Sequence, residues 1–175
     1  MSVPLSQRFR QMGWALTAPF TPLDHGLIEQ TLGAAALVAL FERMRPSERL
    51  HGLRVMQTLK AAGYDHPDLM VAALLHDVGK SRYGLNLLDR VIIVILRRLW
   101  PAWAKKAAQG SPNGWRRALV ISEQHPIWSA EDLKEAGASP LAVRLARCHA
   151  NPVAQPPQNE EDRLLAALQW ADDLN

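Results

Sequence analysis

The amino-acid sequence predicts an all-α protein, and three observations support that prediction. Alanine and leucine, which both favour helices, dominate the 175-residue chain. No segment alternates polar with β-branched residues over the length of a strand. Prolines and glycines divide the chain into stretches of helical length. Hydrophobic residues at 48% and charged residues at 21% indicate one globular domain with a substantial core.

Nine helices are expected, and most of them are bounded by a local signal. They cover about 24–44, 47–62, 67–77, 85–100, 102–109, 113–124, 128–136, 140–150 and 160–173. Gly63 ends the second helix, and Pro67 lies in the first turn of the third. The breaks between the fourth and seventh helices fall at Pro101, Pro112 and Pro126.

The last two helices have the clearest start signals. Ser139 is a favourable N-cap directly before Pro140, and Asn159 precedes an acidic first turn made of Glu160, Glu161 and Asp162. Between these helices, residues 151–158 read NPVAQPPQ, which predicts an extended connector.

The segment at 85–106 is unusually apolar for a surface helix. It reads LNLLDRVIIVILRRLWPAWAKK, and its charges at Asp89, Arg90, Arg97 and Arg98 exclude a membrane span. A buried central helix is the first expectation. A dimer interface is the second, and a helix anchored at a membrane surface by Trp100 and Trp103 is the third.

The charge distribution indicates an anionic partner. Residues 80–117 contain nine Lys or Arg and one acid, whereas the rest of the chain contains eleven basic and sixteen acidic residues. An anionic small molecule is expected rather than nucleic acid, because no nucleic-acid motif is present and few aromatics accompany the basic residues. Cys148 is the only cysteine, which excludes an intramolecular disulfide and a cysteine zinc site. No signal-peptide pattern is found, so a cytoplasmic protein is expected.

Several histidines and one late carboxylate project from apolar helix faces. Positions three, four and seven residues away share the face of a given helical residue. By that rule, apolar residues flank the side chains of His51, His76, His125, His149 and Asp172, and His76 adds its neighbour Asp77. Any one of these could be an ordinary core histidine. Together they would leave several costly unpaired polar groups in the core unless they bind something.

A dinuclear metal site made of imidazoles and carboxylates would resolve that burial problem. The mixed nitrogen and oxygen ligands favour iron or manganese, and zinc, nickel or magnesium fit less distinctively.

The order of these residues resembles the H…HD…D signature of the HD-domain metal-dependent phosphohydrolases, in particular the HDIG type. The stretch at 76–80, HDVGK, is similar to the HDIGK form of the motif, and 123–139 reads EQHPIWSAEDLKEAGAS, which resembles the HPEIGAELLEEAG stretch. The sequences ARCHA at 146–150 and LQWADDLN at 168–175 resemble later parts of the family pattern. Two departures are Ser129 for a usual glycine and Cys148 for the first histidine of a pair.

The resemblance covers about residues 45–175 and implies an HD-domain-like helical bundle at 46–175 behind an N-terminal helical extension at 1–45, together one compact unit. It also implies metal ligands. A first ion would be held by His51, His76, Asp77 and Asp172, and a second by His125 and His149, with Asp77 as the bridge. Asp173 is a rival for Asp172, and His25 and His66 are expected on the surface or at helix caps.

The activity implied by the resemblance is hydrolysis of a phosphoester or phosphoanhydride in a nucleotide-like substrate by a metal-bridging hydroxide. Asp77 and Lys80 would be catalytic, with Gly79 allowing the chain to turn so that Lys80 reaches the phosphate; Arg82 is either an assistant or a solvated charge. Two alternatives stay open: an HD-fold diiron oxygenase with the same six ligands, and a nucleotide-binding module without turnover. A homodimer is a further expectation.

Overall fold

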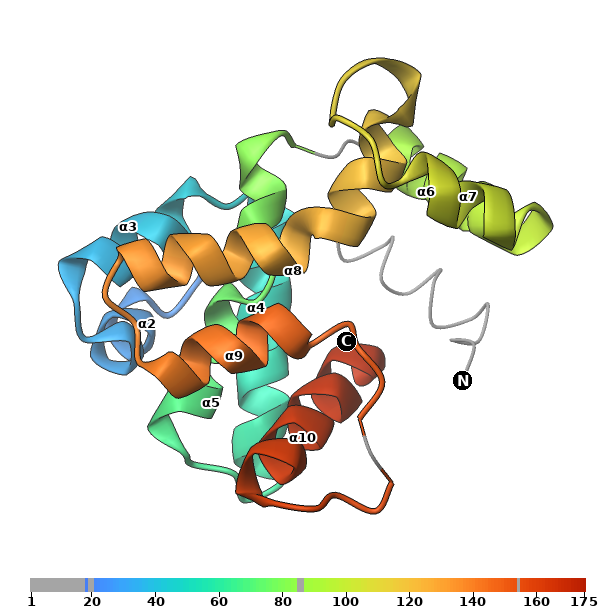
Figure 1. Cartoon of the computed structure of the whole chain (residues 1–175). Helices are drawn as coiled ribbons and strands as arrows, with labels where there is room; N and C mark the ends of the chain where they lie inside the picture. Colours follow the sequence, from blue (N-terminus) through green and yellow to red (C-terminus); the bar gives the residue numbers. More distant parts are fainter. Residues whose placement is uncertain (1–17, 19–20, 85–86, 154) are drawn as a thin grey trace.

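The computed structural model describes residues 18, 21–84, 87–153 and 155–175, and within them it contains helices and no strands (Figure 1). The all-α prediction is therefore confirmed. In chain order the elements are α2 (His25–Leu32), α3 (Ala35–Arg43), α4 (Pro46–Ala61), α5 (Pro67–Leu75), the 3-10 helix η2 (Val78–Arg82), α6 (Leu87–Leu99), α7 (Pro101–Ala107), the 3-10 helix η3 (Gly114–Arg116), α8 (Arg117–Glu135), α9 (Pro140–Cys148) and α10 (Glu160–Leu174). Residues 1–17, 19–20 and 85–86 of the expected N-terminal extension and apolar segment lie outside the described residues.

The single helix expected at 24–44 is wrong, because the chain forms two helices there. Gly33 has a φ of 68°, a left-handed conformation that glycine adopts without steric cost, and it ends α2 by donating its N–H to the carbonyl of Glu29. The side chain of Asp24 accepts the N–H of Leu27 at the start of α2. The turn lets α2 and α3 both pack against α5.

The core surrounds α5 (Figure 1), in which every residue from Leu69 to Leu75 is buried. Helices α4, α9 and α10 pack against it on the side of the candidate ligands. Gly52 lets α4 approach closely, because a Cβ atom there would lie 2.7 Å from the carbonyl oxygen of Leu74. The approach places His51 beside His76, with ring centroids 5.3 Å apart. The close helix contact thus brings the first two candidate ligands together.

The break expected at Pro126 is also wrong. Helix α8 runs without interruption from Arg117 to Glu135, so the helices expected at 113–124 and 128–136 are one, and only η3 precedes it. A proline inside a helix removes one backbone hydrogen bond, but α8 packs against α9 and η2 along this stretch, and that packing holds the helix together. The other expected helices agree with the structure to within two residues at each described end.

Helices α6 and α7 form a hairpin at one end of the molecule (Figure 1). They pack on α8 through a small separate cluster of buried residues, namely Ile93, Ala104, Ala107, Ala108, Ala118, Leu119 and Ile121. Most of the remaining large apolar side chains of this hairpin are exposed, so the buried central helix that was expected first for 85–106 is wrong. No helix in the described part of the chain has the length and apolar character needed to cross a membrane.

Candidate metal centre

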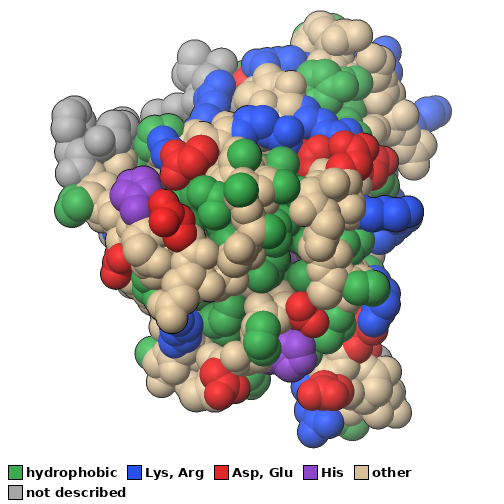
Figure 2. Space-filling model, turned by 90° about the vertical axis from the view of Figure 1, so that its left-hand side faces the viewer, with side chains coloured by type: hydrophobic (Ala, Val, Ile, Leu, Met, Phe, Trp, Pro, Cys, Tyr) green, Lys and Arg blue, Asp and Glu red, His purple; other side chains and the backbone are tan. Residues whose placement is uncertain are grey.

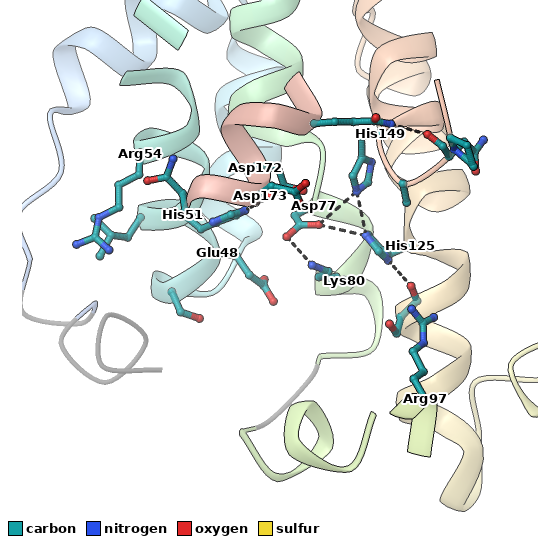
Figure 3. Close-up of a pocket in the computed structure, with 18 residues that line it drawn as sticks. Glu48, His51, Arg54, Asp77, Lys80, Arg97, His125, His149, Asp172 and Asp173 are labelled. Atoms are coloured by element: carbon teal, nitrogen blue, oxygen red, sulfur yellow. Dashed lines mark hydrogen bonds and ion pairs between the residues drawn. The ribbon is translucent and has the colours of Figure 1, made fainter. Parts of the chain in front are cut away.

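Five helical segments bring the predicted ligands to one point, and Figure 3 draws all of these ligands except His76. His51 comes from α4, and His76 and Asp77 follow the last residue of α5. His125 lies in the middle of α8. His149 directly follows α9, and Asp172 lies near the end of α10. The ligand atoms form three overlapping groups, and within each group they lie within 4.8 Å of one another. The groups are His51, His76 and Asp77; His76, His149 and Asp172; and Asp77, His125 and His149.

Asp77 occupies the centre of the cluster. Its Oδ1 lies 3.2 Å from Nε2 of His125, 3.8 Å from Nε2 of His76 and 3.9 Å from Nε2 of His149. Asp172 lies on the other side of His76: its Oδ1 is 3.7 Å from Nε2 of His76 and 2.8 Å from Nε2 of His51. His76 therefore lies between the two carboxylates, with Asp77, His125 and His149 on one side of it and Asp172 and His51 on the other.

The three most buried histidines are oriented in the same way, by a hydrogen bond from Nδ1 to a backbone carbonyl oxygen of the preceding turn. Nδ1 of His76 lies 3.1 Å from the carbonyl oxygen of Ala73, and Nδ1 of His149 lies 2.7 Å from that of Ala146. Nδ1 of His125 lies 3.1 Å from the carbonyl oxygens of both Ile121 and Ser122 in the preceding turn. A carbonyl oxygen can only accept, so each Nδ1 must carry the proton, and in a neutral ring Nε2 then presents its lone pair to the centre.

Pro126 leaves one of these carbonyl oxygens, that of Ser122, without its usual helical donor. In a regular helix the carbonyl of Ser122 would accept the N–H of residue 126, but proline has none. That carbonyl instead accepts from Nδ1 of His125. The proline inside α8 thus helps to fix the tautomer and direction of a candidate ligand, a role that the sequence pattern alone did not reveal.

The inward-facing nitrogens are poorly satisfied without a cation. Nε2 of His76 is a buried atom with no hydrogen-bond partner in the described part of the chain. Nε2 of His125 and Nε2 of His149 lie 3.2 Å apart, and in neutral rings with Nδ1 protonated their lone pairs face each other and Asp77. Such an arrangement is unfavourable unless a positive ion accepts these lone pairs. The donor set, imidazole nitrogen with carboxylate oxygen, fits a transition-metal ion.

The pKa values favour the ligating forms of most members. Burial raises the pKa of Asp77, but Lys80 and His76 outweigh burial and hold it well below its usual value. Burial also opposes ionisation of Asp172, yet a hydrogen bond from His51 and the nearby charge of His76 hold its pKa well below its usual value. Burial, with His76 as a further cause, lowers the pKa of His149 to about 3, and burial with Lys80 lowers the pKa of His125. Two carboxylates are therefore charged and two imidazoles neutral at pH 7.

His76 differs from the other two buried histidines. Burial lowers its pKa, but the negative charges of Asp77 and Asp172 on either side together outweigh burial and raise the pKa to about 9. The ring is therefore an imidazolium at neutral pH when the two carboxylates have no other cation. A metal ion bound to Nε2 has to displace this proton.

Lys80 reaches the centre from η2. Its ammonium nitrogen lies 2.5 Å from Oδ2 of Asp77, the oxygen that faces away from the histidines. The expected turn at Gly79 is wrong, since that residue has no positive φ and lies buried within η2. Glycine is needed there for a different reason: a Cβ atom would overlap the carbonyl oxygen of His125 and lie 2.7 Å from the backbone nitrogen of Ser129.

Ser129, which departs from the usual glycine of the family pattern, has a visible role. Its hydroxyl accepts the N–H of Gly79 at 2.9 Å, so it joins η2 to α8 directly behind Asp77. Cys148, the other departure, lies one residue before His149 and does not belong to any of the three ligand groups.

Arg82 points away from the centre. Its guanidinium pairs with Glu131 and with the buried carboxylate of Asp132, to which Arg43 of α3 also donates. This ion-pair cluster was not predicted from the sequence. It fixes η2 against α3 and α8, so the residue considered as an assistant in catalysis instead holds the segment that carries Lys80.

The remaining residues considered in the sequence lie outside the centre. His25 is exposed and pairs with Glu42, and the side chain of His66 accepts the N–H of Asp68 at the start of α5, as expected of surface and capping residues. Asp173 is exposed and belongs to none of the three ligand groups. Burial, with the charge of Asp172, raises its pKa.

The centre opens into a cavity of about 720 Å³ (Figure 3). Asp77, Lys80 and four other candidate ligands line it, and the sequence analysis missed three further charged lining residues, namely Glu48, Arg54 and Arg97. Glu48 and Arg54 stand three residues before and after His51, so the helical spacing around a candidate ligand could have identified both. Arg97 gave no such signal, because it reaches the cavity from α6, which is far from the ligands in sequence.

Comparison with known proteins agrees with this geometry. The family model of the HD domain matches residues 50–175, which include every candidate ligand. A search of curated proteins and a search of solved structures found no match. Because the match covers well over half of the chain, includes an all-α bundle and contains the His/Asp cluster, the chain belongs to the HD-domain family, whose members are generally metal-dependent hydrolases.

Proposed function

We propose that this protein is a metal-dependent phosphohydrolase that cleaves a phosphoester or phosphoanhydride of a nucleotide-like substrate. One observation carries the proposal: a carboxylate, Asp77, lies between two sets of inward-facing histidine nitrogens and also contacts an ammonium group from Lys80. The carboxylate of Asp77 is thus surrounded by ligands for two cations and by the ammonium group of Lys80. Phosphoryl transfer is catalysed by such a concentration of positive charge, which stabilises the negative charge of the phosphate in the transition state.

The proposed ligand sets divide the cluster at Asp77. His51, His76, Asp77 and Asp172 would hold one ion, and His125 and His149 would hold a second, with Asp77 shared. Bound divalent ions, iron or manganese most readily, would supply a nucleophile at neutral pH by lowering the pKa of water and would offset charge on the phosphate. The shared carboxylate explains why Asp77 is the most central group.

The protein's own residues position and neutralise the substrate. Lys80 is held at Asp77 by its ion pair and by η2, so its charge is in place before a phosphate enters. Arg54 and Arg97 line the cavity and would add positive charge near phosphate oxygens. A volume of about 720 Å³ is large enough for a nucleotide. Glu48 on the wall would disfavour a further phosphate close to it.

The test is a turnover screen with matched variants. Protein loaded with manganese or with ferrous iron is incubated with a panel of nucleotides and cyclic nucleotides, and products are separated by ion-exchange chromatography. We expect metal-dependent phosphate or nucleotide release that His125→Ala abolishes and that His25→Ala, at an exposed histidine, preserves.

Two results would contradict the proposal. Iron-dependent oxygen consumption with an organic substrate and no phosphate release would assign the same ligands to the oxygenase alternative. Nucleotide binding by calorimetry without any product over hours would assign them to a binding module.

A further inference from the structure

The α6–α7 hairpin exposes an apolar surface that the described part of the chain leaves uncovered. We call it the α6–α7 face. Its large apolar side chains are each at least 40% exposed: Val91, Ile92, Val94, Ile95, Leu99, Trp100 and Trp103. Isolated exposed apolar residues are common on proteins, but a contiguous group on one helical hairpin indicates a binding surface.

The face is separate from the side of the hairpin that packs on the protein. Ile93 is buried and Leu96 packs with the same small cluster, so this stripe of α6 satisfies the contact with α8. Val91 and Ile95 stand on the opposite side of the helix, one turn apart, and Arg98 and Leu99 continue that side. Helix α6 therefore has two apolar faces, and the fold uses one of them.

The charges around the face are of one sign. Residues 91–107 contain four basic and no acidic residues. Arg97 pairs with Glu123, but Arg98, Lys105 and Lys106 pair with no acidic side chain in the described part of the chain. On the side of the molecule away from this hairpin, where α2 and α3 lie, basic side chains lie next to acidic ones (Figure 2). The apolar face is thus bordered by uncompensated positive charge.

Tryptophan side chains gather at the same place. Trp100 and Trp103 belong to the face, and Trp103 stacks on the exposed Trp115 of η3 with ring centroids 5.6 Å apart. The guanidinium of Arg116 lies 5.3 Å from the Trp115 ring. Tryptophan with arginine or lysine is typical of helices that lie at the boundary between lipid headgroups and acyl chains.

We propose that the α6–α7 face docks on the surface of an anionic lipid membrane, with α6 lying in the plane of the interface. The apolar side chains would enter the acyl boundary, and Arg98, Lys105 and Lys106 would contact lipid phosphates. A second copy of the chain fits the charges less well, because a symmetric dimer through this face would bring two sets of unpaired cations together.

The test is co-sedimentation of the full chain with vesicles, using a matched pair of variants. Vesicles of phosphatidylcholine with about 30% phosphatidylserine are compared with pure phosphatidylcholine. Ile95→Glu changes the face at a residue that is 47% exposed, and Ile127→Glu makes the same change on α8 at a residue that is 43% exposed. Circular dichroism checks that both variants remain folded.

We expect binding to the anionic vesicles that falls about tenfold or more in Ile95→Glu, is unchanged in Ile127→Glu and weakens at high salt. A triple variant, Arg98→Ala with Lys105→Ala and Lys106→Ala, should lose the preference for anionic lipid while keeping the apolar residues. Failure of the wild type to bind, or equal binding by both glutamate variants, would overturn the proposal. So would a dimer, seen by analytical ultracentrifugation without lipid, that only Ile95→Glu dissociates.

Discussion

Loading of the metal centre should displace a proton from His76, so metal affinity should rise steeply with pH. His76 lies between the charged carboxylates of Asp77 and Asp172, and its pKa is raised to about 9. The metal-free ring is protonated below that pH, whereas metal binding needs the neutral ring. The carboxylates of Asp77 and Asp172 keep their charge across the neutral range, and His149 and His125 have lowered pKa values, so none of these four should add a competing proton.

The magnitude follows from the pKa of His76. At pH 7 the neutral ring is about 1% of the metal-free population, which weakens metal binding about 100-fold, or about 2.7 kcal/mol at 1.36 kcal/mol for each pH unit. At pH 8 the penalty is about tenfold. The apparent dissociation constant for Mn²⁺ should therefore fall about tenfold between pH 7 and pH 8, with at least one proton released for each ion bound by His76.

Isothermal titration calorimetry in two buffers of different ionisation enthalpy measures both quantities. His66→Gln, which changes a helix-cap histidine away from the centre, should leave the proton release unchanged. An affinity that stays constant between pH 7 and pH 8, with the same heat in both buffers, would mean that His76 is already neutral. The argument from the two flanking carboxylates would then be refuted.

Three further outcomes are expected. Elemental analysis after gel filtration should show that His125→Ala lowers the manganese content from about two ions to about one and that Asp77→Ala loses both ions. A wild type with a single ion, unaffected by His125→Ala, would contradict the two-metal assignment. Lys80→Ala should keep its metal but lose about 100-fold or more in turnover, because one preorganised charge at a phosphoryl group is worth this much; Lys60→Ala on the surface of α4 is the control, and an unchanged rate would remove Lys80 from the mechanism. Gly79→Ala should lower the free energy of unfolding by about 1–3 kcal/mol in a urea titration, because its methyl group overlaps the backbone of α8. Gly110→Ala, where the nearest atom is 3.8 Å away, should change it little, and equal stability of the two variants would show that η2 shifts freely.

The fold class and the candidate ligands could be predicted from the sequence for a physical reason. Helix caps and first-turn prolines are local signals, and those at Ser139, Pro140 and Asn159 mark α9 and α10 correctly. A histidine on an apolar helix face must find a partner in the core, and this burial argument selected His76, His125 and His149. His125 is far from the other ligands in sequence, but this did not affect the prediction, because the argument uses only the neighbouring residues on the same helical face.

The errors arose where tertiary contacts override a local signal. Pro126 indicated a break, but the packing of α8 against α9 and η2 holds the helix together, and the carbonyl left without a helical partner binds the His125 ring. Gly79 indicated a turn, whereas it is needed because two backbones meet there. The composition of 85–106 indicated burial, yet composition does not say how many faces of a helix the fold can cover.

The ion pairs at Asp132 have a consequence for how separable this domain is. Arg43 of α3 donates to Asp132 and, at 3.0 Å, to the hydroxyl of Ser81, so a residue that precedes the region matched by the family model holds η2, which carries Lys80. A shortened chain starting at residue 46 would keep every candidate ligand and lose this brace. Metal binding and catalytic rate would then become separable properties: the matched region carries the whole ligand cluster, whereas the placement of its lysine depends in part on a helix that precedes this region.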